Sequence, residues 1–444
     1  MSEKRENVDL QKIYAMLTEK KDAVLPEGVK EEFFKVPYLD HKGERKEVNA
    51  CLYLPESDTP VPLIYVSHYK ITKDSMELYP YLAKGWAVAC VYEETDMNIE
   101  VTRDVLVFNS AILYELRHRR EIDETRIAIT GGSAGGYTGM MLSALHLLAC
   151  CTLVRGAFAN AYFNFRHYAP SLNRYNLPAL LALKEEDRKD IMTLIQKLPI
   201  PYAIVFNTFS NDEVNARLDD LEIAAAVSPV MLADCLSNPL MEVHNTSDIL
   251  VPVDQITRSF TYDHVSDDLP EDFPIRLNDF DLPESMNHSL VEMLPEGSYT
   301  ERLLPLVPVG EIQELPFDEK EFQINIFDEG EPVSHGSHGS GKPAGISSDL
   351  AYLQHFIEMG NASSFLTDGK LRMLMERYSG TSIQMPGHEG EIYGSLEVYR
   401  KEIEEELAAY RKSHPEEDVL DRMRRCAEER PSLREAVEKC MANL

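Results

Sequence analysis

The chain has 444 residues, 44% of them apolar, and a formal net charge of −31. This length accommodates one large α/β domain with additions, or two domains. Nucleic acids and anionic membrane surfaces bind basic patches, so the strong negative charge argues against both as partners.

The N-terminal residues and the cysteines indicate a compartment. Met1-Ser-Glu-Lys-Arg5 is charged rather than apolar, which predicts no secretory signal peptide. No apolar run approaches the roughly 18 residues of a membrane-spanning helix. The seven cysteines include no C-x-x-C pair, a pattern that favours neither a disulfide framework nor a zinc site. We therefore expect a cytoplasmic protein.

In chain order, the pattern predicts helices and strands that alternate over much of the sequence. A surface helix over 8–20 belongs to an N-terminal helical brace, 1–30, and is followed by an antiparallel hairpin of strands 31–39 and 46–54. Such alternation predicts an α/β fold, a mostly parallel sheet with helices on both faces and active groups at the carboxyl ends of the strands. The further predicted strands are 61–67, 86–92, 126–130, 154–159, 239–244 and 322–327, and the helices between them include 75–84, 99–119 and 136–150.

Long segments without strand patterns divide the chain further. Residues 161–235 predict a helical cap over the active face, and 262–318 form an acidic, proline-rich insertion with little regular pattern. We expect a catalytic domain over 31–348 that contains both. A C-terminal helical extension, 349–444, carries acidic and basic neighbours at helical spacing. It would pack on the body or join two copies into a homo-oligomer.

A serine motif lies between a predicted strand and a predicted helix. Gly131-Gly-Ser-Ala-Gly135 is a complete G-x-S-x-G, and in this context the motif indicates a nucleophile elbow. Ser133 would take a strained backbone conformation that projects its hydroxyl, while Gly131 and Gly135 let strand and helix approach closely. The alternative is a glycine-rich turn with an incidental serine.

A nucleophilic serine requires an acid and a base. In this fold the order along the chain is serine, acid, histidine. Asp248 lies in the loop after the predicted strand 239–244, which places it at a carboxyl end and makes it the candidate acid. The alternative is an aspartate whose side chain serves its own turn.

The base should follow the last predicted strand, 322–327. The loop after that strand contains His335 and His338, and we favour His335 because it is nearer the strand. A metal site built from the two histidines is an alternative.

Two hydrogen-bond donors are needed to stabilise an oxyanion. One is the backbone N–H of Ala134, at the start of a helix. The other is Tyr69, in the loop Ser67-His-Tyr-Lys70 after the third predicted strand. The alternative for Tyr69 is an aromatic side chain that only packs at the strand end.

No cofactor or metal is expected. The segment Gly336 to Lys342 fits the pattern G-x-x-x-x-G-K, but Pro343 occupies the position where a phosphate-binding loop requires serine or threonine. We therefore reject nucleotide binding.

Several of these segments resemble the prolyl oligopeptidase-type branch of the α/β-hydrolase superfamily. They are the serine motif after Arg126-Ile-Ala-Ile-Thr130, the segment Ala225-Ala-Val-Ser-Pro-Val230 and the strand and loop that carry Asp248. The tyrosine of Ser-His-Tyr69 is similar to the oxyanion donor of these enzymes and of cocaine esterase-like acyl hydrolases. The segment Pro332-Val-Ser-His335 resembles the histidine loop of the cocaine esterase-like enzymes. The resemblance implies a triad of Ser133, Asp248 and His335, an acyl-enzyme intermediate and no cofactor.

The sequence thus favours a serine hydrolase that cleaves a small acyl ester under the cap. A peptidase acting on a short peptide uses the same machinery and is one alternative. A binding protein with this fold but without catalysis is the other.

Overall fold

The computed structural model describes twelve stretches of the chain. They are residues 24–39, 44–75, 77–92, 103–145, 149–166, 228–236, 238–246, 248, 251–260, 282–304, 322–327 and 343–360. The predicted helix at 8–20, most of the predicted cap, the histidine loop and the helices predicted after 360 lie outside them. Among the helices described, none has the length and apolar character needed to cross a bilayer.

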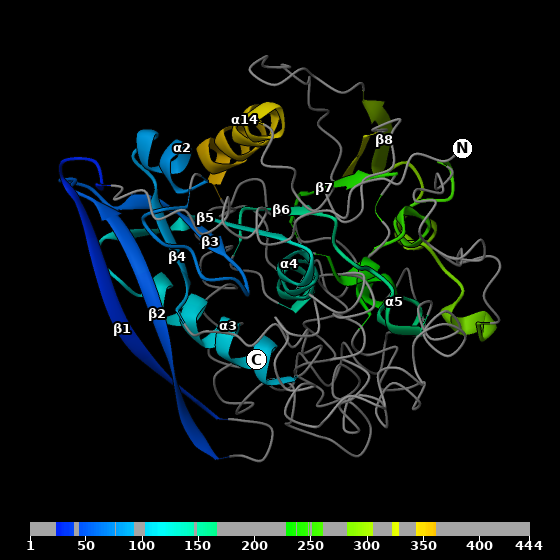
Figure 1. The fold of residues 1–444 in the computed structure, drawn as a ribbon, viewed down its shortest axis with the longest axis horizontal. Coiled ribbons are helices and arrows are strands. Elements are labelled where there is room, and N and C mark those ends of the chain that lie inside the picture. Colours follow the sequence, from blue (N-terminus) through cyan, green and yellow to red (C-terminus); the bar gives the residue numbers. More distant parts are fainter. Residues whose placement is uncertain are drawn as a thin grey trace, which may run out of the picture.

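The described strands form one nine-stranded sheet in the order β1-β2-β4-β3-β5-β6-β7-β9-β8 (Figure 1). Strand β2 pairs antiparallel with both β1 and β4, and all the other pairings are parallel. The strands are β1 (Val29–Leu39), β2 (Arg45–Pro55), β3 (Val61–Val66), β4 (Ala87–Val91), β5 (Ile122–Gly132), β6 (Cys151–Arg155), β7 (Leu240–Asn245), β8 (Tyr299–Leu304) and β9 (Phe322–Phe327).

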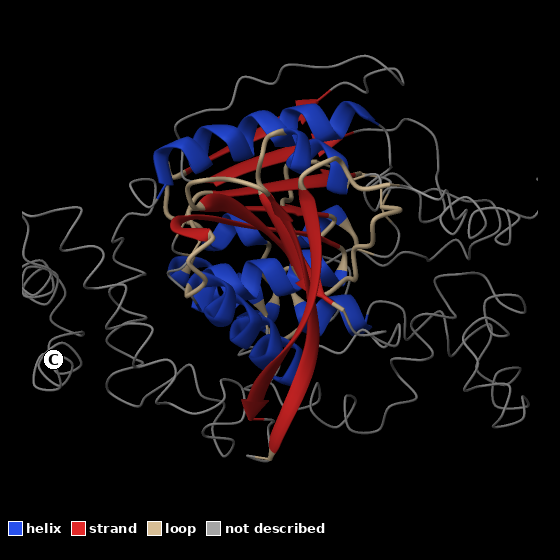
Figure 2. Cartoon of the chain, turned by 90° about the vertical axis from the view of Figure 1, so that its left-hand side faces the viewer, coloured by secondary structure: helices blue, strands red, loops and turns tan. Residues whose placement is uncertain are grey.

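Helices cover both faces of this sheet (Figure 2). Helices α2 (Leu78–Ala83) and α14 (Pro343–Met359) pack on one face, and α3 (Arg103–Arg117) and α4 (Ala134–Leu145) on the other. Successive residues of a strand point to opposite faces, so Cys51 and Tyr53 of β2 join the first core, whereas Ala50 and Leu52 join the second. The central strand β3 is buried along its whole length.

The remaining described elements are short. They are α5 (Ala161–Arg166), α13 (Leu290–Met293) and the 3-10 turns η2 (Pro229–Cys235), η3 (Val253–Gln255) and η4 (Glu284–Met286). Elements α5 and η2 lie at the two ends of the predicted cap. The predicted boundary at 348 falls inside α14, whose buried Tyr352, Leu353 and Phe356 are part of the core beside the sheet.

The α/β prediction is confirmed, and three details of it are corrected. Strand β6 is Cys151–Arg155 rather than 154–159, because Gly156, at a φ of 52°, turns the chain out of the sheet. Helix α4 is described over Ala134–Leu145, and residues 149 and 150 are not helical, so the predicted end at 150 is corrected. The insertion 262–318, in which little regular structure was expected, contains β8, a parallel edge strand on β9. Most of β8 is only half-buried, and this explains its weak apolar pattern.

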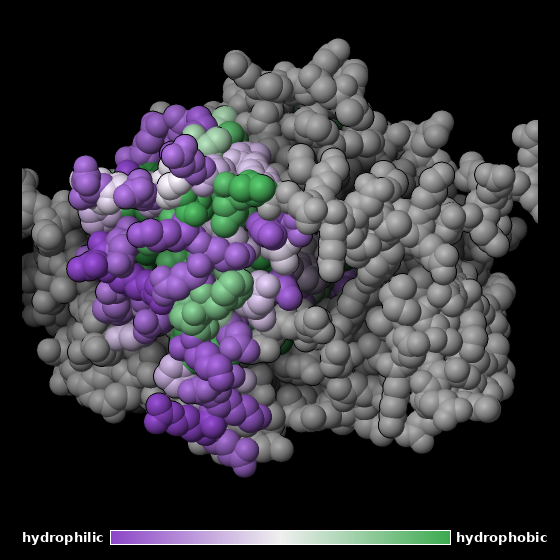
Figure 3. Space-filling model, turned by 60° about the vertical axis from the view of Figure 1, so that its left-hand side comes forward, coloured by the Kyte–Doolittle hydropathy of each residue, from purple (hydrophilic) through white to green (hydrophobic). Residues whose placement is uncertain are grey.

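The antiparallel pair β1 and β2 extends beyond the body at one side (Figure 1). The outward face of this side is largely hydrophilic, with small hydrophobic areas (Figure 3). Phe33 of β1 is 54% exposed and packs edge-on against Tyr92 at a centroid distance of 4.6 Å. Strand β1 is an edge strand, and its charged residues, among them Lys30, Glu31 and Glu32, suit an edge that does not pair further.

Candidate active site

Ser133 occupies a tight turn between β5 and α4. Its φ of 54° lies in the left-handed region, where residues other than glycine incur a steric cost. Its N–H donates to the carbonyl of Arg155 on β6 (2.8 Å), and its own carbonyl accepts from the N–H of Tyr137 (2.9 Å), which begins the helical hydrogen bonding. The chain thus passes from strand to helix within one strained residue, as a nucleophile elbow requires.

The two motif glycines are needed because of what lies beside them. A Cβ at Gly131 would stand 2.5 Å from the backbone carbon and oxygen of Gly135, and a Cβ at Gly135 would stand 2.6 Å from the carbonyl of Ser67. Gly132 differs, since a Cβ there would meet nothing closer than 3.7 Å. The hydroxyl of Ser67 links strand β5 to the start of helix α4, because it donates to the carbonyl oxygens of Gly135 (2.7 Å) and Thr130 (3.0 Å).

Tyr69 lies over the start of α4. Its ring is the side chain that a Cβ at Gly135 would contact, at 3.1 Å. Tyr69 is 41% exposed as a residue, but burial around the phenol raises its pKa. Hydrogen bonding to the Ser133 side chain and to the Ala134 N–H acts in the opposite direction. The three groups predicted for the attack and for the oxyanion therefore lie together.

His68 is a second strained residue in this loop, with a φ of 72°. Its ring is buried and meets the Tyr69 ring edge-on at a centroid distance of 4.6 Å. Burial lowers the pKa of His68 to about 4, so the imidazole is neutral at pH 7. The backbone N–H of His68 donates to the side-chain oxygen of Asn109 (3.3 Å), which also accepts from the Tyr65 hydroxyl (2.6 Å). Asn109 of α3 thereby anchors the strained loop.

Asp248 is fully buried just beyond the carboxyl end of β7. One carboxylate oxygen accepts from the N–H of Val251 (2.9 Å), and its own N–H donates to the carbonyl of Asn245 (3.1 Å). The first of these contacts is the local side-chain turn that the sequence left as the alternative. Strands β5 and β7 are both parallel neighbours of β6, so Ser133 and Asp248 lie at the same edge of the sheet.

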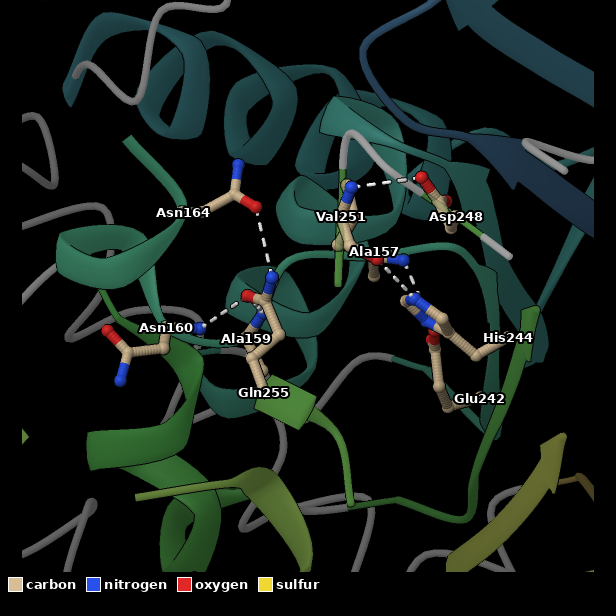
Figure 4. A network of polar contacts seen from close by, with 9 residues as sticks. All are labelled: Ala157, Ala159, Asn160, Asn164, Glu242, His244, Asp248, Val251 and Gln255. Atoms are coloured by element: carbon tan, nitrogen blue, oxygen red, sulfur yellow. Dashed lines mark hydrogen bonds and ion pairs between the residues drawn. The ribbon is translucent and has the colours of Figure 1, made fainter. Parts of the chain in front are cut away.

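A buried pair of ionisable residues lies beside Asp248. Glu242 and His244 of β7 have fully buried side chains, and Glu242 Oε1 is 2.8 Å from His244 Nδ1. His244 Nε2 lies 2.7 Å from the carbonyl oxygen of Val251, and the N–H of Ala157 donates to Glu242 Oε1 (3.1 Å). Figure 4 shows this cluster beside Asp248. Sequence reasoning missed both residues.

The electrostatics of the pair follow from its burial. Burial raises the pKa of Glu242 to about 7, against the opposing effects of its hydrogen bonds with His244 and Ala157. Burial lowers the pKa of His244, but the hydrogen bond and charge of Glu242 raise it above its ordinary value overall. Acidic and basic residues on a central buried strand are rare unless paired. The presence of both in Leu240-Met-Glu-Val-His244 was therefore the sequence signal that could have revealed the pair.

Gln255, another residue that sequence reasoning missed, holds the adjacent turn. Its side-chain oxygen accepts from the N–H groups of Ala159 (2.9 Å) and Asn160 (3.1 Å), and its amide donates to Asn164 of α5 (3.0 Å). Figure 4 shows this second cluster next to the first, where Gln255 of η3 meets the segment that leads from β6 to α5. The signal was again a polar residue, Gln255, next to an apolar run.

The structure therefore brings Ser133, Ala134 and Tyr69 together and places Asp248 at the same edge of the sheet. His335 and His338 lie outside the described residues, so the choice between them stays a prediction. The strand order and the strained serine between β5 and α4 define an α/β-hydrolase fold.

Comparisons with known proteins find similar solved structures but no similar sequence. No protein-family model matches the sequence, and no curated protein is similar to it in sequence. Among solved structures, the acylaminoacyl peptidase of Pyrococcus horikoshii is similar at a TM-score of 0.42 and 17% identity over 79% of this chain and 44% of that one. A puromycin hydrolase is similar at a TM-score of 0.45 and 12% identity over 74% of this chain and 40% of that one. Dipeptidyl peptidase 4 of Porphyromonas gingivalis is similar at a TM-score of 0.40 and 15% identity over 79% of this chain and 38% of that one. The chain spans less than half the length of each.

Proposed function

We propose that the protein is a serine hydrolase that cleaves an acyl ester through a covalent acyl-enzyme. The observation that carries the proposal is Ser133, a residue other than glycine held at a φ of 54° between β5 and α4. Such strain persists only where the surroundings impose it, and it concentrates at active sites. The glycine contacts on either side supply that constraint.

The roles follow from the chemistry of acyl transfer. Ser133 Oγ attacks the carbonyl carbon while His335 accepts the hydroxyl proton, and Asp248 orients the imidazole and stabilises its cation. The Ala134 N–H and the Tyr69 hydroxyl donate to the oxyanion. What supports the second donor is the hydrogen bonding of the Tyr69 phenol with Ser133 and Ala134.

The step then completes without a cofactor. The carbonyl re-forms as the bond to the leaving alcohol breaks, and His335 gives its proton to that alcohol. Water attacks the acyl-enzyme as His335 takes one of its protons, and return of that proton to Ser133 Oγ releases the carboxylic acid. An alkoxide leaves with less need of proton donation than an amine does, so the same residues would cleave an ester more readily than the alternative, a peptide or other amide.

Steady-state hydrolysis tests the proposal and separates the two substrates. We expect wild-type protein to hydrolyse p-nitrophenyl esters of short acids faster than aminoacyl anilides, and Ser133→Ala to abolish the reaction. His335→Ala and His338→Ala identify the base, because only the true base should reduce the rate by several orders of magnitude. Hydrolysis that survives in Ser133→Ala would contradict the proposal, whereas preference for anilides would support the peptidase alternative.

A further inference from the structure

The buried pair of Glu242 and His244 holds the chain on both sides of the active edge. His244 Nε2 contacts the carbonyl of Val251 at 2.7 Å, and the N–H of that same residue donates to Asp248 (2.9 Å). Val251 is therefore held through its carbonyl by His244 and through its amide by Asp248. A shift of His244 would therefore move Val251, whose N–H is the hydrogen-bond donor to the Asp248 carboxylate.

Glu242 extends this link to the elbow. Its Oε1 accepts from the N–H of Ala157 (3.1 Å), and Ala157 packs so closely on the serine helix that a Cβ at Gly136 would stand 2.7 Å from its side chain. The pair thus connects the helix that follows Ser133 with the loop that holds Asp248, through hydrogen bonds that are all buried. Figure 4 shows the part of this link from Ala157 to Asp248.

The hydrogen bonds also require a particular arrangement of protons. The Val251 carbonyl can only accept, so His244 Nε2 carries a proton. One further proton lies between His244 Nδ1 and Glu242 Oε1, which are 2.8 Å apart. Glu242 Oε1 must at the same time accept from Ala157. A glutamine at 242 could not replace both contacts of Glu242 Oε1. Its amide nitrogen cannot accept the hydrogen bond from the Ala157 N–H, and its neutral oxygen could accept from His244 Nδ1 only if His244 were an imidazolium with no carboxylate to balance its charge.

We propose that Glu242 and His244 are positioning residues that fix Asp248 for its role toward the catalytic histidine. The inference rests on the proposed function and deepens it, because it assigns two residues that act on the reaction only through Asp248. The charged groups that bear on the pair are Asp248 itself and Arg155 of β6. Both lie at the same sheet edge, so the pair belongs to the electrostatics of the site.

A double-mutant cycle with Asp248 tests this role. The variants are Glu242→Gln, which keeps the side-chain shape, and His244→Gln as an independent second change, each made alone and together with Asp248→Asn. The readouts are kcat and KM for p-nitrophenyl acetate and the rate constant for labelling of Ser133 by a fluorophosphonate. Misplacing a catalytic group by about 1 Å can cost roughly a hundredfold in rate, so we expect each single variant to lose tenfold or more in kcat.

The control is Asn238→Ala, at the opposite end of β7. Its side-chain oxygen accepts from the hydroxyls of Ser143 and Thr152 (2.9 Å each) and is buried, so the variant should lower the thermal midpoint without a comparable fall in kcat. In the Asp248→Asn background, Glu242→Gln and His244→Gln should each change the labelling rate by less than twofold, because the residue through which they act is already disabled.

The outcomes separate the inference from the function on which it rests. Equal losses with and without Asp248→Asn, or unchanged kcat in both single variants, would overturn the positioning role while leaving the hydrolase intact. An Asp248→Asn protein as active as wild type would contradict the proposed function itself, since replacing a triad acid by its amide usually costs about 10⁴-fold in kcat.

Discussion

Replacing Gly131 with alanine should disrupt the elbow, whereas the same change at Gly132 should be tolerated. The new methyl group at 131 would stand 2.5 Å from the backbone of Gly135 and 2.6 Å from the Ser67 hydroxyl. Backbone atoms cannot turn aside as a flexible side chain can, so strand β5 and helix α4 must separate. Overpacking of this kind costs about 1–3 kcal/mol. At Gly132 the nearest atom is the Arg155 carbonyl oxygen at 3.7 Å, an ordinary contact.

The assay compares the two alanine variants by thermal unfolding and by the rate of Ser133 labelling with a fluorophosphonate. At roughly 2–4 °C per kcal/mol for a domain of this class, Gly131→Ala should lower the midpoint by about 2–12 °C. Its labelling rate should fall by tenfold or more, because the serine moves with the turn. Gly132→Ala should stay within about 2 °C and threefold of wild type. Indistinguishable behaviour of the two variants would refute the packing argument.

Three further predictions concern the oxyanion loop and the buried pair. Tyr69→Phe removes one oxyanion donor and should lower kcat about a hundredfold, roughly 3 kcal/mol, and a rate within twofold of wild type would remove Tyr69 from the site. His68→Asn should keep the labelling rate within about threefold, because asparagine tolerates a positive φ, whereas His68→Val should lose tenfold or more, and equal rates would show that the backbone strain at 68 is unimportant. The raised pKa values of Glu242 and His244 mean that the folded pair binds more protons than the unfolded chain, so the stability it contributes falls as the pH rises through about 7. Wild type should therefore lose more of its thermal midpoint than Glu242→Gln between about pH 5.5 and 8, and parallel curves would contradict the assigned shifts.

Local pattern was sufficient to predict much of the sheet. The run that became β3 is apolar throughout because both faces of a parallel strand are covered. The run that became β9 alternates apolar residues with the buried Gln323 and Asn325. The serine motif was informative because only glycine lets strand and helix approach this closely, and the contacts at Gly131 and Gly135 give the physical reason. The edge strand β8 could not be found in this way, since its residues are mostly half-buried and its pairing with β9 is tertiary.

The polar framework around Asp248 was beyond sequence reasoning for a different reason. Glu242 and His244 looked like interruptions of a strand, and their meaning depends on two backbone groups, of Ala157 and Val251, that only the fold brings to them. The left-handed backbone of His68 was equally invisible, because no sequence rule marks a histidine as strained. In each case the decisive contact joins segments far apart in the chain.

The most direct test of the central claim is where a fluorophosphonate attaches. We expect intact-protein mass spectrometry to find one adduct per chain after brief treatment, peptide mapping to locate it at Ser133, and heat-denatured protein and Ser133→Ala to remain unlabelled. Absence of labelling in the folded wild-type protein, or an adduct on any other residue that persists in Ser133→Ala, would contradict the account.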